Sequence, residues 1–187
     1  DTQEKIMRLI EKSLESYHQG KYDEAISGYD EVIKLDSEYG DAYYNKGIVL
    51  FDQNLFEESN KCYDQIIKID PSHKEVWLNK GVNLFMLKKY EESIQCYDEV
   101  IKMDSKDDMG WSNKGESLVC LDRYEEAMAC YDESIMINDK SNNLWILTEE
   151  RPKREVIEKI IIKSSEKKGL EIKIKDLKIL PSIINNI

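Results

Sequence analysis

Four cysteines and two histidines are the side chains of this sequence best suited to hold a metal or to act as a nucleophile. Cys62, Cys96 and Cys130 follow one another at intervals of 34 residues, which makes them members of a repeated pattern first. A zinc site needs closely spaced Cys or His pairs, and the sequence has no such spacing. Cys120 is a single thiol without a neighbouring base. We therefore predict no metal, and small buried thiols in a reducing compartment, the cytoplasm.

The other polar residues give no sign of catalysis. His18 and His73 stand where we expect turns between helices, and acidic pairs such as Glu57-Glu58 open helices, where carboxylates complement the helix dipole. The sequence contains no glycine-rich phosphate loop, nucleophile elbow or zinc motif. We predict no catalytic residues and no cofactor, and hence a protein that is not an enzyme.

Composition narrows the class of protein further. The 187 residues include 27 Lys and Arg against 38 Asp and Glu, a net charge of −11. A nucleic-acid binder needs a basic face to release counterions, so this balance argues against nucleic acid. No apolar run approaches the ~18 to 20 residues that span a bilayer, so we expect no membrane association. With only 3 Pro and 8 Gly, the sequence also lacks the turns of a many-stranded β protein.

The elements that position these residues follow from a 34-residue repeat. Four copies of an aromatic-acidic-acidic segment succeed one another without insertion, beginning at Tyr22, Phe56, Tyr90 and Tyr124. Apolar residues within each copy have helical spacing on both sides of a short polar turn such as 52–54. Pro71 ends one copy, because proline cannot continue a helix interior. Each copy therefore predicts a helix hairpin that must stack on its neighbours to bury its apolar face.

Two further positions repeat inside the first helix of each pair. Gly47, Gly81 and Gly115 each cost about 1 kcal/mol relative to Ala in a helix, so their repetition predicts a close approach of the paired helix. A lysine precedes each of these glycines. We expect its stem to pack between helices while the ammonium group reaches water.

The repeated residues resemble the tetratricopeptide repeat family. The resemblance is carried by Tyr43, Trp77 and Trp111, by the glycine four residues after each, and by a small residue at Ala25, Ser59, Ser93 and Ala127. It covers residues 6–141, and the Asn-Lys-Gly spelling is similar to prokaryotic, especially archaeal, members. It implies an all-α fold: a right-handed solenoid of stacked antiparallel helix hairpins at 6–39, 40–73, 74–107 and 108–141. The first copy departs from the pattern at Leu9 and Ser13.

Residues 142–187 do not repeat. Pro152 interrupts what would be the first helix of a fifth unit, and 153–168 predicts an amphipathic helix that caps the last hairpin. An Ile/Lys-rich tail follows. Residues 1–141 carry 17 basic and 31 acidic side chains, a net charge of −14, whereas residues 142–187 carry 10 and 7, a net charge of +3. The basic tail could therefore dock on the acidic repeats, in the same chain or a neighbour.

In solenoids of this family the first helix of each pair lines a concave groove, and the resemblance assigns a peptide-binding role there. The residues that it implies are Tyr44, Asn45, Ile48, Phe51, Leu78, Asn79, Val82, Phe85, Met86, Asn113, Glu116 and Val119. Phenylalanines and aliphatic residues on a face that no further helix covers would form an exposed apolar patch. Such patches usually mark an interaction site.

Asparagines at one position of successive repeats suggest how a ligand is held. Asn45, Asn79 and Asn113 resemble the asparagine ladder with which some family members grip a peptide main chain, since an amide both donates and accepts. The alternative is that these amides only occupy half-exposed helix positions and bond water. The carboxylate clamp of chaperone-binding members is absent, because the cations are missing and Glu75 would repel a carboxylate. We therefore expect a ligand with apolar anchors and basic flanks.

Two classes of function follow from these observations. The first is a protein–protein interaction scaffold that binds a peptide or helix segment in the groove. The second is a structural or self-assembly module, whose tail docks in its own or a neighbour's groove and can build a homo-oligomer. A regulatory domain of a larger protein is a further alternative.

Overall fold

The computed structural model describes residues 2–141, which form helices joined by short turns. In chain order the helices are α1 (Thr2–His18), α2 (Tyr22–Leu35), α3 (Gly40–Asp52), α4 (Phe56–Ile69), α5 (Lys74–Met86), α6 (Tyr90–Met103), α7 (Asp108–Cys120) and α8 (Tyr124–Ser141). No strand occurs between residues 2 and 141, so the described part is all-α, as predicted. The capping helix predicted at 153–168 and the Ile/Lys-rich tail lie outside the described residues.

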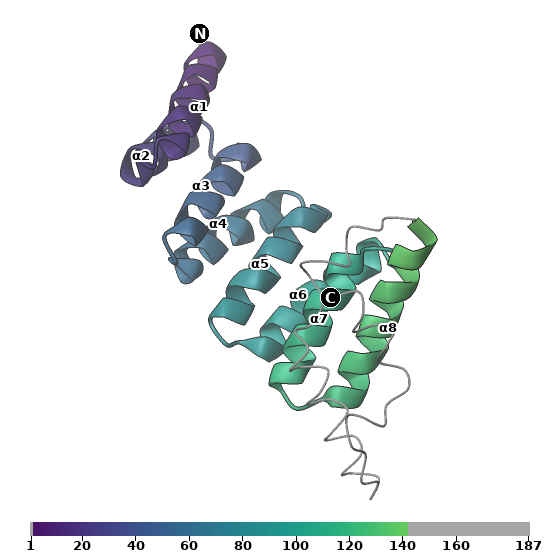
Figure 1. The fold of residues 1–187 in the computed structure, drawn as a ribbon. Coiled ribbons are helices and arrows are strands. Elements are labelled where there is room, and N and C mark those ends of the chain that lie inside the picture. Colours follow the sequence, from purple (N-terminus) through teal and green to yellow (C-terminus); the bar gives the residue numbers. More distant parts are fainter. Residues whose placement is uncertain (1, 142–187) are drawn as a thin grey trace, which may run out of the picture. The chain divides into compact units, whose positions relative to one another are not determined.

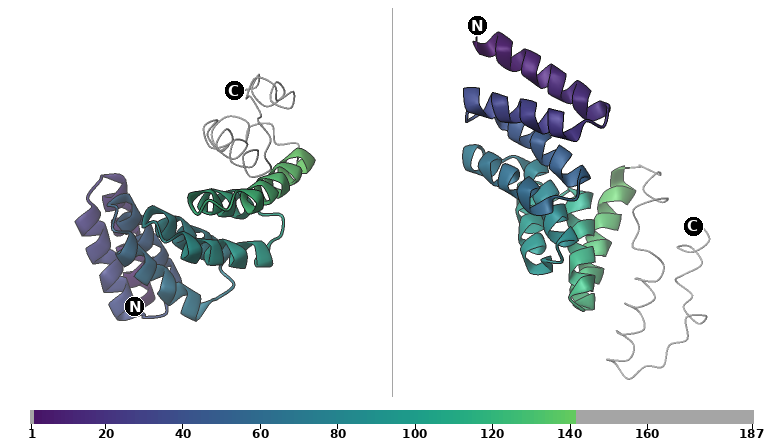
Figure 2. Two further views of the ribbon diagram at one scale, coloured as in Figure 1. Left: turned by 90° about the horizontal axis from the view of Figure 1, so that it is seen from below. Right: turned by 90° about the vertical axis from the view of Figure 1, so that its left-hand side faces the viewer.

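The helices belong to two compact units that divide after Met103. The first unit contains the antiparallel hairpins α1/α2, α3/α4 and α5/α6, drawn in purple to teal in Figure 1. Its hairpins stack because α2 packs against α3, and α4 packs against α5. The second unit contains the α7/α8 hairpin. Figure 2 shows the same helix pairs from two further directions. The predicted architecture of stacked helix hairpins is confirmed.

All four hairpins turn in the same way. The second residue after the first helix has a positive φ in each: 72° at Gly20, 61° at Asn54, 60° at Lys88 and 59° at Asp122. The next backbone N–H then donates to a carbonyl five residues earlier, as from Leu55 to Leu50 at 2.9 Å. This is the Schellman arrangement, which satisfies carbonyl groups at the end of a helix. The repeated turn keeps every second helix in one orientation relative to its first.

The repeated glycines mark the closest contact inside a hairpin. A Cβ atom on Gly47 would lie 2.6 Å from the Tyr63 ring, one on Gly81 2.5 Å from Tyr97, and one on Gly115 2.7 Å from Tyr131. No real Cβ makes contacts this short, so the tyrosine ring occupies the space that the glycine leaves. The packing reason predicted for these glycines is confirmed.

The first hairpin exchanges the small residue between its helices. Ser13 stands on α1 where later copies have glycine, and Gly28 stands on α2 where later copies have Cys62, Cys96 or Cys130. A Cβ on Gly28 would lie only 2.0 Å from Ser13 Oγ, which donates to the Leu9 carbonyl at 2.7 Å. The departure of the first copy from the repeat pattern is therefore compensated across the hairpin.

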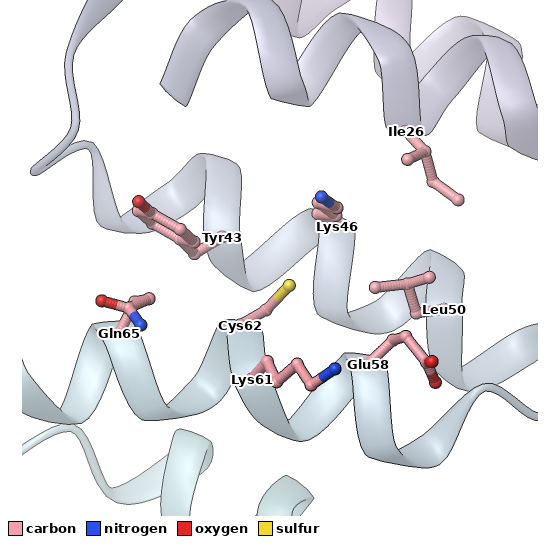
Figure 3. Close-up of a pocket in the computed structure, with 8 residues that line it drawn as sticks. All are labelled: Ile26, Tyr43, Lys46, Leu50, Glu58, Lys61, Cys62 and Gln65. Atoms are coloured by element: carbon pink, nitrogen blue, oxygen red, sulfur yellow. The ribbon is translucent and has the colours of Figure 1, made fainter. Parts of the chain in front are cut away.

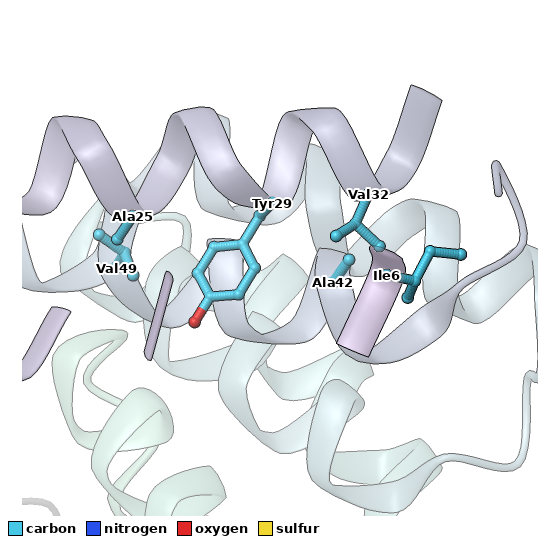
Figure 4. Close-up of a cluster of buried hydrophobic side chains, with 6 residues drawn as sticks. All are labelled: Ile6, Ala25, Tyr29, Val32, Ala42 and Val49. Atoms are coloured by element: carbon cyan, nitrogen blue, oxygen red, sulfur yellow. The ribbon is translucent and has the colours of Figure 1, made fainter. Parts of the chain in front are cut away.

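The core of the first unit lies at the junctions between hairpins. Figure 4 shows Tyr29 and Val32 of α2 beside Ala42 of α3, with Ile6, Ala25 and Val49 in the same buried cluster. The second junction repeats this with Tyr63, Ile66 and Val76. Helices α2 and α4 thus each pack both on the first helix of their own hairpin and on the first helix of the next hairpin.

One buried contact between hairpins is polar. Asn83 of α5 has none of its surface exposed. Its Nδ2 donates to Asn60 Oδ1 at 2.8 Å and to Ser59 Oγ at 2.9 Å, both on α4. The equivalent residues at the first junction, Ile26 and Val49, are apolar. A pair of asparagines therefore distinguishes the second junction from the first.

Candidate functional site

The predicted groove residues divide between the two units. Nine lie on α3 and α5 of the first unit, whereas Asn113, Glu116 and Val119 lie on α7 of the second and are half-buried there. On α1, the residues 34 positions before the α3 set are mostly apolar, and sequence reasoning left them out of the site. Three of these four residues are apolar, and Met7 lies one turn before them, whereas Glu11 stands at the position of Asn45. We call the four apolar α1 residues together with the nine predicted ones the A-helix face: Met7, Ile10, Leu14, Tyr17, Tyr44, Asn45, Ile48, Phe51, Leu78, Asn79, Val82, Phe85 and Met86.

Two hydrogen bonds join the three helices along this face. Tyr17 OH of α1 donates to Asp52 Oδ2 of α3 at 2.7 Å. Asn79 Nδ2 of α5 donates to Tyr44 OH of α3 at 3.3 Å. The hydrogen bond to Asp52 raises the pKa of Tyr17 to about 12. The A-helix face is therefore a continuous surface of α1, α3 and α5, and the structure brings the predicted residues Tyr44 and Asn79 together.

The amides of the asparagine ladder already have partners within the first unit. Asn45 Nδ2 donates to the carbonyl of Asp41 in its own helix at 2.9 Å, while Asn79 is held by Tyr44. Their carbonyl oxygens take no part in these two bonds. An incoming main chain would therefore meet these amides as acceptors first, and would have to compete for the Nδ2 donors.

The phenylalanines of the face contribute to packing as well as to the surface. Phe51 lies edge-on to Phe56 with ring centroids 5.5 Å apart, and Phe85 lies edge-on to Tyr90 at 5.4 Å. Each pair fastens the first helix of a hairpin to the start of the second. Both phenylalanines are half-buried, so their substitution would perturb the hairpin together with any ligand contact.

The most exposed apolar residues of the A-helix face are methionines near its ends. Met7 on α1 is 61% exposed and Met86 on α5 is 49% exposed. Exposed carboxylates adjoin the apolar residues along the helices, from Glu11, Asp41, Asp52 and Glu75. The face thus combines apolar residues with an acidic border. The thioether side chains of its two exposed methionines are long and flexible, so they can adapt to the shape of a ligand.

The repeated lysines have a different role from the one predicted. Lys46 Nζ lies 2.6 Å from Asp30 Oδ1, and Lys80 Nζ lies 2.6 Å from Asp64 Oδ1, so each lysine bridges two hairpins. Lys80 also lies 5.7 Å above the Trp77 ring. We expected the ammonium groups to be solvated by water. In the first unit they instead form ion pairs with carboxylates of the preceding hairpin.

The cysteines behave as structural residues. Cys62, Cys96 and Cys130 are buried, as predicted, and burial raises the pKa of the Cys62 and Cys96 thiols to about 11. A protonated thiol is a poor nucleophile and a poor metal ligand. Between residues 2 and 141 no group of three or more His, Cys, Asp or Glu side chains could hold a metal ion. Cys120 is free and exposed on α7.

A hollow of about 440 Å³ lies on another side of the first unit, between α2, α3 and α4. Figure 3 shows Tyr43, Lys46 and Cys62 around it. None of the predicted site residues lines it. The equivalent of Tyr43 in the next repeat is Trp77, whose indole nitrogen donates to the Pro71 carbonyl at 2.9 Å. Sequence reasoning treated these aromatic residues as one pattern and so did not single out Tyr43.

Family models match along most of the described chain. A model described as TPR repeat matches residues 14–54, and models described as tetratricopeptide repeat match residues 40–73, 75–107 and 110–141. No curated protein matches the sequence. None of the helices between residues 2 and 141 is long and apolar enough to cross a membrane.

Solved structures with a similar fold come from several proteins. MamA 41-end from Desulfovibrio magneticus RS-1 has a TM-score of 0.67 at 15% identity, covering 87% of this chain and 96% of that one. The first TPR of Spaghetti (RPAP3), bound to the HSP90 peptide SRMEEVD, has a TM-score of 0.60 at 24% identity over 65% of this chain and 95% of that one. The second TPR domain of human RPAP3, in complex with the HSP70 peptide SGPTIEEVD, has a TM-score of 0.58 at 19% identity, covering 63% and 98%.

Proposed function

The chain belongs to the tetratricopeptide repeat family, and we propose that it is a non-enzymatic interaction scaffold that binds a peptide or helix segment on its A-helix face. The observation that carries this proposal is the apolar character of the face, near whose ends Met7 is 61% and Met86 49% exposed. Half-buried apolar residues of α1, α3 and α5 connect these two exposed methionines, and a contiguous apolar surface of this kind usually marks an interaction site.

The charge of the face selects the ligand. The peptides bound by the two RPAP3 domains, SRMEEVD and SGPTIEEVD, are acidic at their carboxyl ends. Here the A-helix face contains no Lys or Arg, and carboxylates border it at Asp41, Asp52 and Glu75. Like charges across an interface are unfavourable, so an acidic peptide end is a poor ligand. We propose a partner with apolar anchors and basic flanks, with no role for nucleic acid or a membrane.

Labelled peptides of defined chemistry test the proposal. One carries leucines at helical spacing with lysine flanks, a second alternates isoleucine and lysine, and two counterparts replace every lysine with glutamate. Fluorescence anisotropy with the full chain at 150 mM salt gives the affinities. We expect at least one lysine peptide to bind more than about tenfold more tightly than its glutamate counterpart, which corresponds to about 1.4 kcal/mol.

Two double variants with the same added charge identify the binding surface. Met7→Asp with Met86→Asp alters the A-helix face, whereas Ile69→Asp with Met103→Asp alters residues that are 44% and 37% exposed at the ends of α4 and α6. We expect the first pair to weaken lysine-peptide binding about tenfold despite its extra negative charge, and the second pair to leave it within twofold. Equal effects of the two pairs, or equal binding of glutamate peptides, would refute the proposed site.

A further inference from the structure

The A-helix face matches the chemistry of one segment of the same chain. Residues 172–175 alternate isoleucine and lysine, and Lys178 and Ile179 follow shortly after them. With Glu171 and Asp176, the segment 170–187 carries three basic and two acidic side chains, a net charge of +1. Its isoleucines and lysines are the apolar anchors and cations that the face requires. We propose that residues 170–187 bind the A-helix face of their own chain and so compete with an external ligand. This inference rests on the proposed function of that face.

Charge complementarity supports this occupant. Residues 1–141 carry 17 basic and 31 acidic side chains, while residues 142–187 carry 10 basic and 7 acidic ones. At the border of the face, Asp41, Asp52 and Glu75 are exposed, so the three lysines of the segment can meet carboxylates beside the apolar residues. The lysine stems can lie along apolar side chains while their ammonium groups extend to this acidic border.

The length of the segment is also compatible with the width of the A-helix face. Three adjoining helices present a width of about 30 Å, because each helix with its side chains is about 10 Å across. The eleven residues 170–180 span at most about 36 Å when extended, which is enough to cross α1, α3 and α5. Residues 142–169 provide a connection that can reach several tens of ångströms. A tethered ligand acts at an effective concentration in the millimolar range, so even a weak contact would be populated.

Two charge-reversal variants of the full chain test the inference. Lys173→Glu, Lys175→Glu and Lys178→Glu alter the proposed segment, whereas Lys163→Glu, Lys167→Glu and Lys168→Glu introduce the same charge outside it. Affinity for the labelled lysine peptides is measured by anisotropy. We expect the first triple variant to bind the probe at least fivefold more tightly than the unmodified chain, and the second to stay within twofold. A similar change in both variants, or none in the first, would overturn the inference.

A synthetic peptide of residues 170–187 separates this inference from the proposed function. It should bind the Lys173/Lys175/Lys178 variant, displace the lysine probe, and lose about tenfold in affinity when Met7→Asp and Met86→Asp are added. If lysine probes bind on the face but the 170–187 peptide does not, the self-docking inference fails and the proposed function survives. If neither binds there, the proposed function fails. A concentration-dependent dimer that the first triple variant abolishes would contradict docking within one chain.

Discussion

Lys80 Nζ lies 2.6 Å from Asp64 Oδ1, and the same pair occurs 34 residues earlier between Lys46 and Asp30. Each lysine side chain is only 21% exposed, so the charge is partly withdrawn from water. The pair joins the first helix of one hairpin to the second helix of the preceding one. A repeated ion pair at the stacking surface favours the register in which every lysine meets its aspartate.

A double-mutant cycle measures this contact. We expect Lys80→Met, Asp64→Asn and the double variant to give a coupling free energy of about 0.5 to 1 kcal/mol that decreases as salt rises from 0.1 to 1 M. The matched control is Lys102–Glu99, a 3.2 Å pair within α6 whose lysine is 75% exposed, for which coupling should be below about 0.5 kcal/mol. Urea unfolding followed by circular dichroism gives the values. Equal coupling for both pairs would contradict a special role of the junction.

The hairpin glycines give a second prediction. Gly81→Ala would place a Cβ 2.5 Å from the buried Tyr97 ring, whereas a Cβ on Gly40 of α3 would meet nothing within 4 Å. We expect Gly81→Ala to destabilise the protein by about 1 to 3 kcal/mol through overpacking. Gly40→Ala should be neutral or stabilising by up to about 1 kcal/mol, because alanine is the better helix former. The urea midpoint of each variant checks this, and similar midpoints would be inconsistent with the close approach.

The third prediction concerns Asn60 and Asn83, the asparagine pair between α4 and α5. Asn83→Val leaves the buried Asn60 carbonyl oxygen without its donor. Asn60→Ile removes one of the two acceptors of Asn83 Nδ2 and leaves only Ser59 Oγ. Each single variant should lose about 1 to 3 kcal/mol of stability, the cost of an unsatisfied buried polar group. The double variant reproduces the Ile26/Val49 pair of the first junction and should recover most of the loss, since replacing both partners by apolar groups can be nearly neutral. Additive losses would show that the two amides act independently.

The hairpin architecture was predictable because its signals are local and repeat every 34 residues. Apolar spacing marked the helices, and the cost of glycine inside a helix indicated the contact that Gly47 makes with Tyr63. The Lys–Asp pairs were not predicted, because residues 16 positions apart are not neighbours in a single helix or strand. They come into contact only when one hairpin stacks on the next. The same holds for the candidate site, where the face was indicated by position but Tyr44–Asn79 and Tyr17–Asp52 depend on neighbouring hairpins.

The first hairpin shows the same limit for a single substitution. The sequence shows that Ser13 departs from the glycine pattern. It does not show why residue 28 is glycine, which follows only from the short distance between Gly28 and the Ser13 hydroxyl across the hairpin. A residue that violates a repeat can be judged only together with the side chain that faces it. Sequence periodicity identifies the position, whereas the compensating partner lies on the other helix.

The last prediction concerns alkaline pH. Burial raises the pKa of the Cys62 and Cys96 thiols from 9.0 to about 11, and that of the Tyr63 hydroxyl from 10.0 to about 12. Above pH 9 the unfolded chain therefore releases protons that the folded chain keeps, so the free energy of unfolding falls as pH rises. Stability should be constant from pH 7 to about 8 and decrease between pH 9 and 10, by roughly 1 kcal/mol for each buried thiol at pH 10. Urea midpoints at half-unit pH steps measure the slope. Cys62→Ala with Cys96→Ala should flatten it, whereas Cys120→Ala, at an exposed site, should not; a midpoint independent of pH, or equal slopes in both variants, would contradict the assignment to the buried thiols.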